Sequence, residues 1–183
     1  MASKTISVVI PSYNEEKSVQ AMYDRLTAVF RQSLPAYDCE IIFVDDYSTD
    51  QTRPLIRQLA SEDPRVKAIF NARNFGFHRN VFSALSYGRG DATFMLFGDL
   101  QDPPENLPEF VRRWESGRKV VVGQRRSSDE GWLMTFSRFL YYKLIDWFAD
   151  SSQIARFTGY GLYDREFVDI LKDIGDIQPF FKA

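Results

Sequence analysis

Asp99 and Gln101 are the side chains in this 183-residue sequence whose types and spacing best suit metal chemistry. They are separated by one residue, so in an extended segment both side chains point to the same side. Divalent cations such as Mg²⁺ take oxygen ligands from a few carboxylates and from the phosphates of a substrate. The pair is therefore a candidate site for Mg²⁺ or Mn²⁺ that neutralises a diphosphate leaving group, which makes Asp99 a candidate catalytic residue.

Asp102 has a competing structural explanation. The run D-P-P-E that starts at this residue is typical of a helix start, with Asp102 as N-cap, Pro103 at the first helical position and Glu105 closing a capping box. Capping is therefore favoured over metal binding for Asp102. Neither Asp99 nor Gln101 has such an explanation.

Polar side chains also follow two earlier apolar runs. Asp45 and Asp46 come directly after one of them, where a carboxylate can accept hydrogen bonds from a base N–H or a ribose hydroxyl. The alternative for these two residues is an Asx-type turn. Pro11 and Tyr13 follow the first run and could form a wall against which a nucleobase packs. Arg73 follows a third run and could place hydrogen-bond donors near a nucleotide.

These segments need a scaffold that brings them together. Short runs rich in Val, Ile and Phe alternate with longer helical patterns, which predicts βα units and a mainly parallel sheet flanked by helices. Strands are expected at Ile6–Ile10, Ile41–Val44, Val66–Phe70, Thr93–Phe97 and Val120–Val122. Helices are expected at roughly 15–31, 51–61, 76–88, 104–117 and 132–149, then a loop at 158–161 and a short helix from about Asp164. In open sheets of this kind the ligand site lies beyond the carboxyl ends of the strands.

Composition narrows the possible functions. The chain carries 23 basic and 25 acidic residues, a formal net charge of -2, so no basic face for nucleic acid dominates it. A single cysteine and a single histidine exclude a disulfide within the chain and a Cys/His zinc cluster. No apolar run approaches the roughly 18 residues that cross a bilayer. The lack of repeats or flexible linkers predicts one domain over residues 1–183.

The region after the fifth predicted strand is basic and aromatic. Arg125 and Arg138 belong to it, and the planar fork of arginine suits phosphate recognition. Surface charge is an equally good explanation for either residue alone. Basic and aromatic side chains interleave on the predicted helix 132–149, a pattern found both in protein cores and at membrane surfaces. The sequence leaves these alternatives open.

Neither of the two common glycine-rich phosphate loops is present, so a nucleotide would have to be bound through carboxylates and a metal. Taken in order, six segments resemble the family 2 glycosyltransferases of the Rossmann-like GT-A fold. They are most similar to the polyprenyl-phosphate group, which includes dolichol-phosphate mannose synthase and the bactoprenol glucosyltransferases. The segments read V-V-I-P-S-Y-N-E-E, I-I-F-V-D-D-Y-S-T-D, A-R-N-F-G, D-L-Q-D-P-P-E, V-V-G-Q-R-R and T-G-Y-G-L-Y-D-R.

The resemblance assigns roles to individual residues. It implies nucleotide contacts for Pro11, Tyr13, Glu15 and Asp46, with Asp45 close by. It implies a metal held by Asp99 and Gln101, and an acceptor phosphate held by Arg125 and Arg138.

Three departures from the family pattern stand out. Phe97 replaces the first Asp of the usual D-x-D motif, and Tyr47 replaces a glycine. The segment Thr158–Gly161 lacks the acidic or basic residue expected on the acceptor side.

The resemblance implies an inverting enzyme that moves a sugar from a nucleotide-diphosphate donor to a polyprenyl phosphate for cell-envelope glycans, at the cytoplasmic side of a membrane. Members of this group usually continue into membrane-associating helices, so we expect residues 1–183 to be the catalytic part of a longer protein. Transfer to a polysaccharide hydroxyl and a non-catalytic nucleotide-sugar-binding module are the alternatives. Oligomeric assembly stays open.

Overall fold

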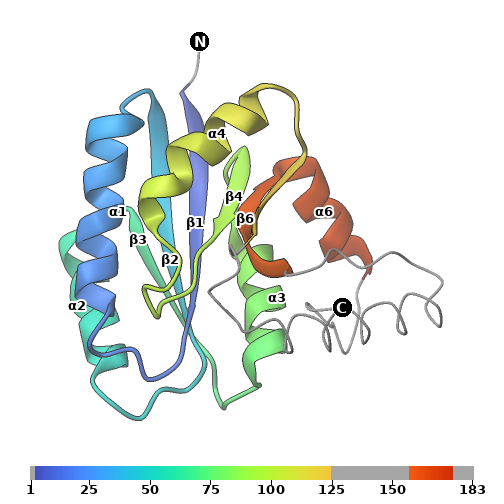
Figure 1. Cartoon of the computed structure of the whole chain (residues 1–183). Coiled ribbons are helices and arrows are strands. Elements are labelled where there is room, and N and C mark those ends of the chain that lie inside the picture. Colours follow the sequence, from blue (N-terminus) through green and yellow to red (C-terminus); the bar gives the residue numbers. More distant parts are fainter. Residues whose placement is uncertain (1–2, 125–156, 175–183) are drawn as a thin grey trace, which may run out of the picture.

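Six strands form one central sheet with helices on both faces (Figure 1). The computed structural model describes residues 3–124 and 157–174. The strands are β1 (Lys4–Ser12), β2 (Tyr37–Asp45), β3 (Val66–Phe70), β4 (Ala92–Met95), β5 (Val120–Gln124) and β6 (Phe157–Asp164). The helices are α1 (Val19–Ser33), α2 (Thr52–Glu62), α3 (Phe77–Tyr87), α4 (Leu107–Glu115), α6 (Arg165–Ile174) and the short 3₁₀ helix η1 (Pro104–Asn106).

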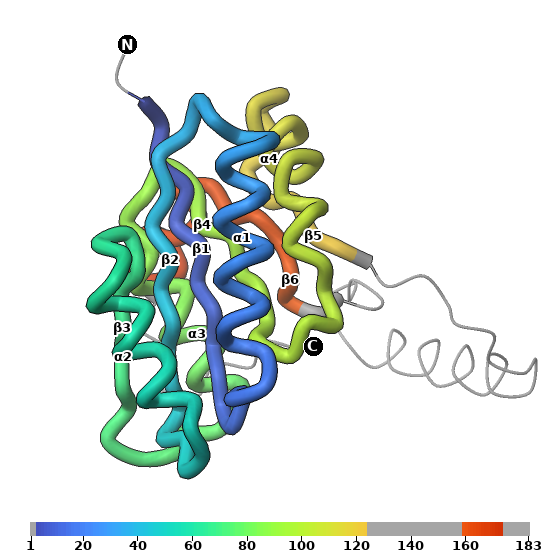
Figure 2. The backbone as a smooth tube through the Cα atoms, turned by 90° about the vertical axis from the view of Figure 1, so that its left-hand side faces the viewer, coloured from blue at the N-terminus to red at the C-terminus, as the bar shows by residue number. Residues whose placement is uncertain are grey.

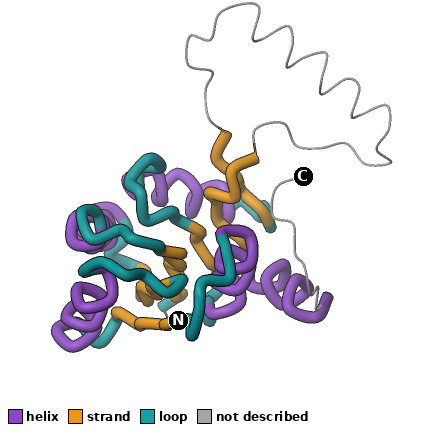
Figure 3. The backbone as a smooth tube through the Cα atoms, turned by 90° about the horizontal axis from the view of Figure 1, so that it is seen from below, coloured by secondary structure: helices purple, strands orange, loops and turns teal. Residues whose placement is uncertain are grey.

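The strand order across the sheet is β3-β2-β1-β4-β6-β5. β1 lies between β2 and β4 and pairs in parallel with both, and β2 pairs in parallel with β3. These pairings confirm the prediction of a mainly parallel sheet. Because parallel strands point the same way, the segments that leave β1, β2, β3 and β4 all emerge at one edge, which Figure 3 views from below.

The first strand shows why its sequence is almost continuously apolar. Ile6, Val8 and Ile10 belong to a core cluster shared with α1, α2 and α4, whose helices cover one face of the sheet (Figure 2). Val9 belongs to a second cluster on the other face, shared with α3 and α6. A strand that is buried on both faces carries apolar side chains on both, so it has no alternating pattern. Ser7 is a buried polar exception, and its hydroxyl donates a hydrogen bond to Glu40.

The prediction of a loop at residues 158–161 is wrong, because these residues belong to β6. β6 is antiparallel to both of its neighbours, β4 and β5. At Gly161 a Cβ atom would lie 2.6 Å from the carbonyl oxygen of Val121, so only glycine allows the strands this close. Tyr160, the neighbour of Gly161 in β6, packs edge-on against Phe94 of β4, with 5.3 Å between the ring centroids. Gly161 therefore marks close strand pairing and not a loop.

The prediction that Asp102 is the N-cap and Pro103 the first helical residue is also wrong, by one position. The first helical residue is Pro104 and the N-cap position falls on Pro103, without a side-chain capping hydrogen bond. Asp102 lies one residue further upstream and is buried, with 5% of its surface exposed. The predicted helix at 132–149 lies outside the described residues. Within the described ranges, no helix has both the length and the hydrophobicity needed to cross a bilayer.

Candidate functional site

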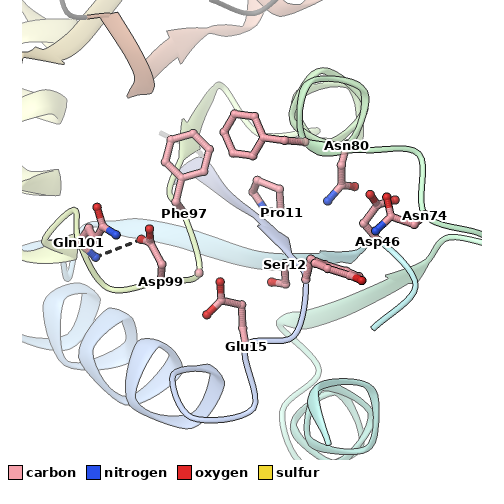
Figure 4. A pocket seen from close by; sticks show the side chains of 12 residues that line it. Pro11, Ser12, Glu15, Asp46, Asn74, Asn80, Phe97, Asp99 and Gln101 are labelled. Carbon is pink, nitrogen blue, oxygen red and sulfur yellow. Dashed lines mark hydrogen bonds between the residues drawn. The ribbon is translucent and has the colours of Figure 1, made fainter. Parts of the chain in front are cut away.

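A cavity of about 450 Å³ opens at the carboxyl edge of the sheet. Its walls come from the segments that follow β1, β2 and β4 and from the start of α3 (Figure 4). Six of the residues predicted from the sequence line it, namely Pro11, Tyr13, Glu15, Asp46, Asp99 and Gln101. Asp45 and Arg73 are not among its lining residues, and Arg125 and Arg138 lie outside the described part of the chain.

Asp99 and Gln101 lie together in the segment after β4. The backbone N–H of Gln101 donates a hydrogen bond to Asp99 Oδ1 at 3.1 Å, which the dashed line in Figure 4 marks. Leu100, between them, has a left-handed backbone with φ of 60°, which is unusual for a bulky residue. The Asp99 side chain is exposed to the cavity, so its carboxylate is accessible to a ligand.

These side chains fit a hard divalent cation, because they offer a carboxylate and an amide oxygen. The set is small. Among the residues that the structure describes, no group of three or more His, Cys, Asp or Glu side chains could hold a metal. Phe97 stands where the family motif would provide a further carboxylate. A cation at this place would therefore need phosphate oxygens from the substrate as additional ligands.

Glu15 brings a second carboxylate next to that of Asp99 (Figure 4). Its Oε2 accepts a hydrogen bond from Ser18 Oγ at 2.9 Å. Burial raises the pKa of Glu15 above its usual value; the Ser18 hydrogen bond opposes this rise, and the charges of Asp99 and Asp50 add to it. The cavity thus concentrates negative charge at the end where Asp99 lies, which favours a bound cation there.

The raised pKa of Glu15 gives a stability prediction. Because the pKa of Glu15 is higher in the folded than in the unfolded protein, ionisation of Glu15 destabilises the fold. This loss of stability sets in as the pH rises above 4.5, where the side chain ionises in the unfolded protein. Glu15→Gln is therefore expected to increase the free energy of unfolding at pH 7, with a gain that shrinks toward pH 4. Urea denaturation at both pH values measures it, with Glu62→Gln on exposed α2 surface as control. A gain that grows toward acid pH would contradict the assignment.

Asp46 lies at the opposite end of the cavity and organises the segment before α3. Its Oδ1 accepts hydrogen bonds from Asn71 Nδ2 at 2.8 Å and from the Phe75 N–H at 2.9 Å. Its Oδ2 accepts one from the Gly76 N–H at 2.9 Å. Gly76 has φ of 86°, a conformation that glycine adopts without strain. Asp46 thus holds the residues before α3 against the end of β2.

Asn80 is a site residue that the sequence did not reveal. It lies on α3, is buried with 4% of its surface exposed, and lines the cavity. Its Nδ2 donates to the carbonyl oxygen of Val44 at 3.1 Å, and its Oδ1 accepts from Asn71 Nδ2 at 3.2 Å. Asn71 in turn donates to Asp46. The sequence offers one signal for Asn80, which is a polar residue in a mostly apolar helix. It does not reveal the hydrogen-bond partners, because they are distant in sequence.

Asp45 has mainly structural contacts. Its side chain is fully buried, and Oδ2 accepts a hydrogen bond from the backbone N–H of Ser48 at 3.1 Å, as the Asx-type alternative predicted. Arg53 Nε lies 3.3 Å from the same oxygen. Ser48 Oγ also accepts a hydrogen bond from the Asn14 N–H, which ties the segment after β2 to the segment after β1.

Tyr47 lies in a left-handed backbone conformation with φ of 67°, at the position where the family usually has glycine. Its ring is 45% exposed, and the Arg53 guanidinium carbon lies 5.7 Å from the ring centroid. Arg73, which was expected near the nucleotide, lies over the Phe75 ring at 4.8 Å. Neither Tyr47 nor Arg73 lines the cavity.

The strain at Tyr47 can be measured with two substitutions that both remove the ring. Tyr47→Gly is expected to be more stable than Tyr47→Ala by about 1 kcal/mol, because alanine keeps the cost of the left-handed conformation and glycine does not. Urea denaturation of the two variants gives the difference directly. Equal stability of the two variants would show that the backbone relaxes once the ring is gone.

Comparison with known proteins places this geometry in a family. Residues 7–170 match the model of glycosyl transferase family 2. The uncharacterised glycosyltransferase YkcC of Bacillus subtilis (strain 168) is 32% identical over 97% of this chain and 54% of its own length. The bactoprenol glucosyl transferase of Shigella phage SfV is 32% identical over 97% of this chain and 58% of its own length. The chain thus spans little more than half of these relatives.

Solved structures agree on the fold. The mannosyltransferase PcManGT from Pyrobaculum calidifontis, in complex with GDP-Man and Mn²⁺, superposes with a TM-score of 0.63 at 20% identity, over 97% of this chain and 48% of that one. Mannosyl-3-phosphoglycerate synthase from Rubrobacter xylanophilus gives a TM-score of 0.63 at 22% identity, over 89% of this chain and 54% of that one. The family match, the relatives and the shared architecture lead to one conclusion. The chain belongs to glycosyltransferase family 2 and has the GT-A fold.

Proposed function

We propose that this chain is the catalytic part of an inverting glycosyltransferase that transfers a sugar from a nucleotide-diphosphate sugar to a polyprenyl phosphate, for cell-envelope glycans at the cytoplasmic side of a membrane. The observation that carries the proposal is the cavity itself. Asp99 and Gln101 offer oxygen ligands at one end, and Asp46 and Asn80 offer polar groups at the other. Curated relatives that carry the name bactoprenol glucosyl transferase support the lipid acceptor.

A donor nucleotide would be oriented by the charge of the cavity. Its diphosphate would repel Asp99 and Glu15 unless a cation lay between them, so Asp99 and Gln101 are the proposed ligands of Mg²⁺ or Mn²⁺. Bound there, the cation would neutralise the charge that develops on the departing diphosphate. The nucleoside would extend along Pro11 and Tyr13 toward Asp46. Solved relatives whose complexes contain Mn²⁺ with GDP-Man or UDP are consistent with this arrangement.

The reaction would be a single in-line displacement. An oxygen of the acceptor phosphate attacks the anomeric carbon, the bond from that carbon to the diphosphate oxygen breaks, and the nucleoside diphosphate leaves with the electron pair. A phosphomonoester, with a second pKa of about 6, is largely dianionic at neutral pH. It therefore needs cationic side chains to hold it more than a general base. Arg125 and Arg138 are the proposed cations on the basis of the sequence pattern.

Transfer to two kinds of acceptor tests this proposal. The full-length protein in detergent is incubated with Mn²⁺, radiolabelled UDP-glucose, UDP-GlcNAc or GDP-mannose, and either undecaprenyl phosphate or a soluble polysaccharide. We expect label in the organic phase with the lipid phosphate. Label only in the polysaccharide would favour transfer to a sugar hydroxyl. Binding of a donor without any turnover would favour a non-catalytic binding module.

A further inference from the structure

Two phenylalanine rings form one wall of the cavity. Phe97 lies two residues after the end of β4, and Phe77 is the first residue of α3. Their rings are stacked, with centroids 5.5 Å apart and an angle of 27° between the planes. Both residues line the cavity, and 50% of the Phe77 surface is exposed. The cavity therefore has an aromatic wall that is built from two separate elements.

The position of Phe97 relates this surface to the two polar ends. Figure 4 shows Phe97 between the pair Asp99 and Gln101 on one side and the pair Asp46 and Asn80 on the other, with Pro11 nearby. The first pair is the proposed place of the cation and the diphosphate. A ligand that reached both ends would therefore lie close to the Phe97 ring.

We propose that Phe97 and Phe77 bind the nucleoside of the donor, by stacking and apolar contact. This inference rests on the proposed function. A nucleobase has a flat face, and stacking on aromatic side chains is how proteins bind such faces without regard to their hydrogen-bonding edges. A phenyl ring at position 97 cannot bind a cation through oxygen. The affinity of the site thus depends more on the nucleoside and less on the metal than it would with aspartate there.

The test compares substitutions that change the wall in different ways. Phe97→Asp restores a carboxylate, Phe97→Leu keeps an apolar side chain without the flat ring, and Phe77→Ala removes the second ring. Tyr87→Ala is the control, because Tyr87 is an exposed aromatic at the other end of α3. Circular dichroism melting first establishes that each variant is folded. Isothermal titration then gives the dissociation constants of UMP, UDP, GMP and GDP, each with Mn²⁺ and with EDTA.

We expect Phe97→Asp to weaken binding of the better monophosphate in EDTA about tenfold, because a base–aromatic stack is lost. The same variant is expected to increase the enhancement of diphosphate binding by Mn²⁺, because it adds an oxygen ligand. Phe97→Leu and Phe77→Ala should weaken monophosphate binding with an unchanged Mn²⁺ enhancement, and Tyr87→Ala should change neither quantity.

Two different results would overturn the inference, and only one of them would also overturn the proposed function. If the unsubstituted protein binds these nucleotides and the Phe97 and Phe77 variants bind monophosphates equally well, the wall does not contact the nucleoside and only this inference fails. If the unsubstituted protein binds none of the four nucleotides, the proposed function fails and the inference fails with it.

Discussion

Asp99→Asn is expected to slow sugar transfer by about 10²- to 10³-fold, the loss typical when one group that stabilises developing charge is removed. The substitution keeps the size of the side chain and an oxygen that can accept the hydrogen bond from the Gln101 N–H. It removes the negative charge that a cation requires. Because Phe97 occupies the place of the other motif carboxylate, Gln101 would be left as a neutral ligand, and Glu15 would be the remaining carboxylate at this end of the cavity.

Initial rates with saturating donor and acceptor measure this effect. A series of Mn²⁺ concentrations shows whether the slower rate comes from weaker binding of the cation. We expect the variant to need more Mn²⁺ for half-maximal rate. Asp24→Asn is the control, because Asp24 lies on the exposed surface of α1 and the charge change is the same. If the rate of the variant stayed within about threefold of that of the unsubstituted protein, the decrease would be far smaller than removal of a charge-stabilising group causes. Such a result would exclude Asp99 from the reaction.

Asp46→Ala is expected to lower the free energy of unfolding by about 3 kcal/mol and to abolish measurable nucleotide binding. Three donors, Asn71 Nδ2 and the N–H groups of Phe75 and Gly76, would lose their carboxylate acceptor. Hydrogen bonds to a charged group contribute about 1.5–3 kcal/mol each, and part of this is recovered when water reaches the exposed donors. The residues before α3 would then no longer be held against the end of β2.

A graded pair of variants separates charge from hydrogen bonding at this position. Asp46→Asn keeps an oxygen that can accept from two of the three donors, so its loss of stability should be smaller than that of Asp46→Ala. Urea denaturation and isothermal titration of both variants give the two quantities. Equal loss in the two variants would mean that the negative charge, and not the number of hydrogen bonds, holds the segment.

The strands and most helices could be predicted because local sequence determines them. An apolar run that is buried on both faces of a parallel sheet is visible without knowledge of its partners, as in Ile6–Ile10. β6 was missed because its glycines were interpreted as loop residues. The role of Gly161, which is to let β6 approach Val121 closely, depends on a neighbouring strand about forty residues away in sequence.

The candidate site was predicted in part for the same reason. Asp99 and Gln101 are close in sequence, and the common strand direction brings Pro11 and Asp46 to the same cavity. The contact from Asn80 through Asn71 to Asp46 was not predictable, because it joins α3 to the ends of β2 and β3. A nucleotide contact for Asp45 stays a prediction; in the structure Asp45 Oδ2 contacts the backbone of its own turn and Arg53.

For Phe97, the structure shows a contact that the departure from the motif does not predict. The sequence identifies it only as a missing carboxylate. In the structure its ring stacks on Phe77 and lines the cavity, so an aromatic ring stands where the motif would place a carboxylate. This difference comes from a contact between two elements that no local pattern encodes.

Titration of a nucleoside diphosphate into the unsubstituted protein, with Mn²⁺ and with EDTA, tests most directly whether the cavity is a metal-assisted donor site. We expect either UDP or GDP to bind, with an affinity at least about tenfold higher in Mn²⁺, within the usual range for coupled ligands. Asp99→Asn should remove that enhancement. Binding that is equally tight in EDTA and unchanged in Asp99→Asn would contradict the role of the metal, and no binding of either nucleotide would contradict the donor site itself.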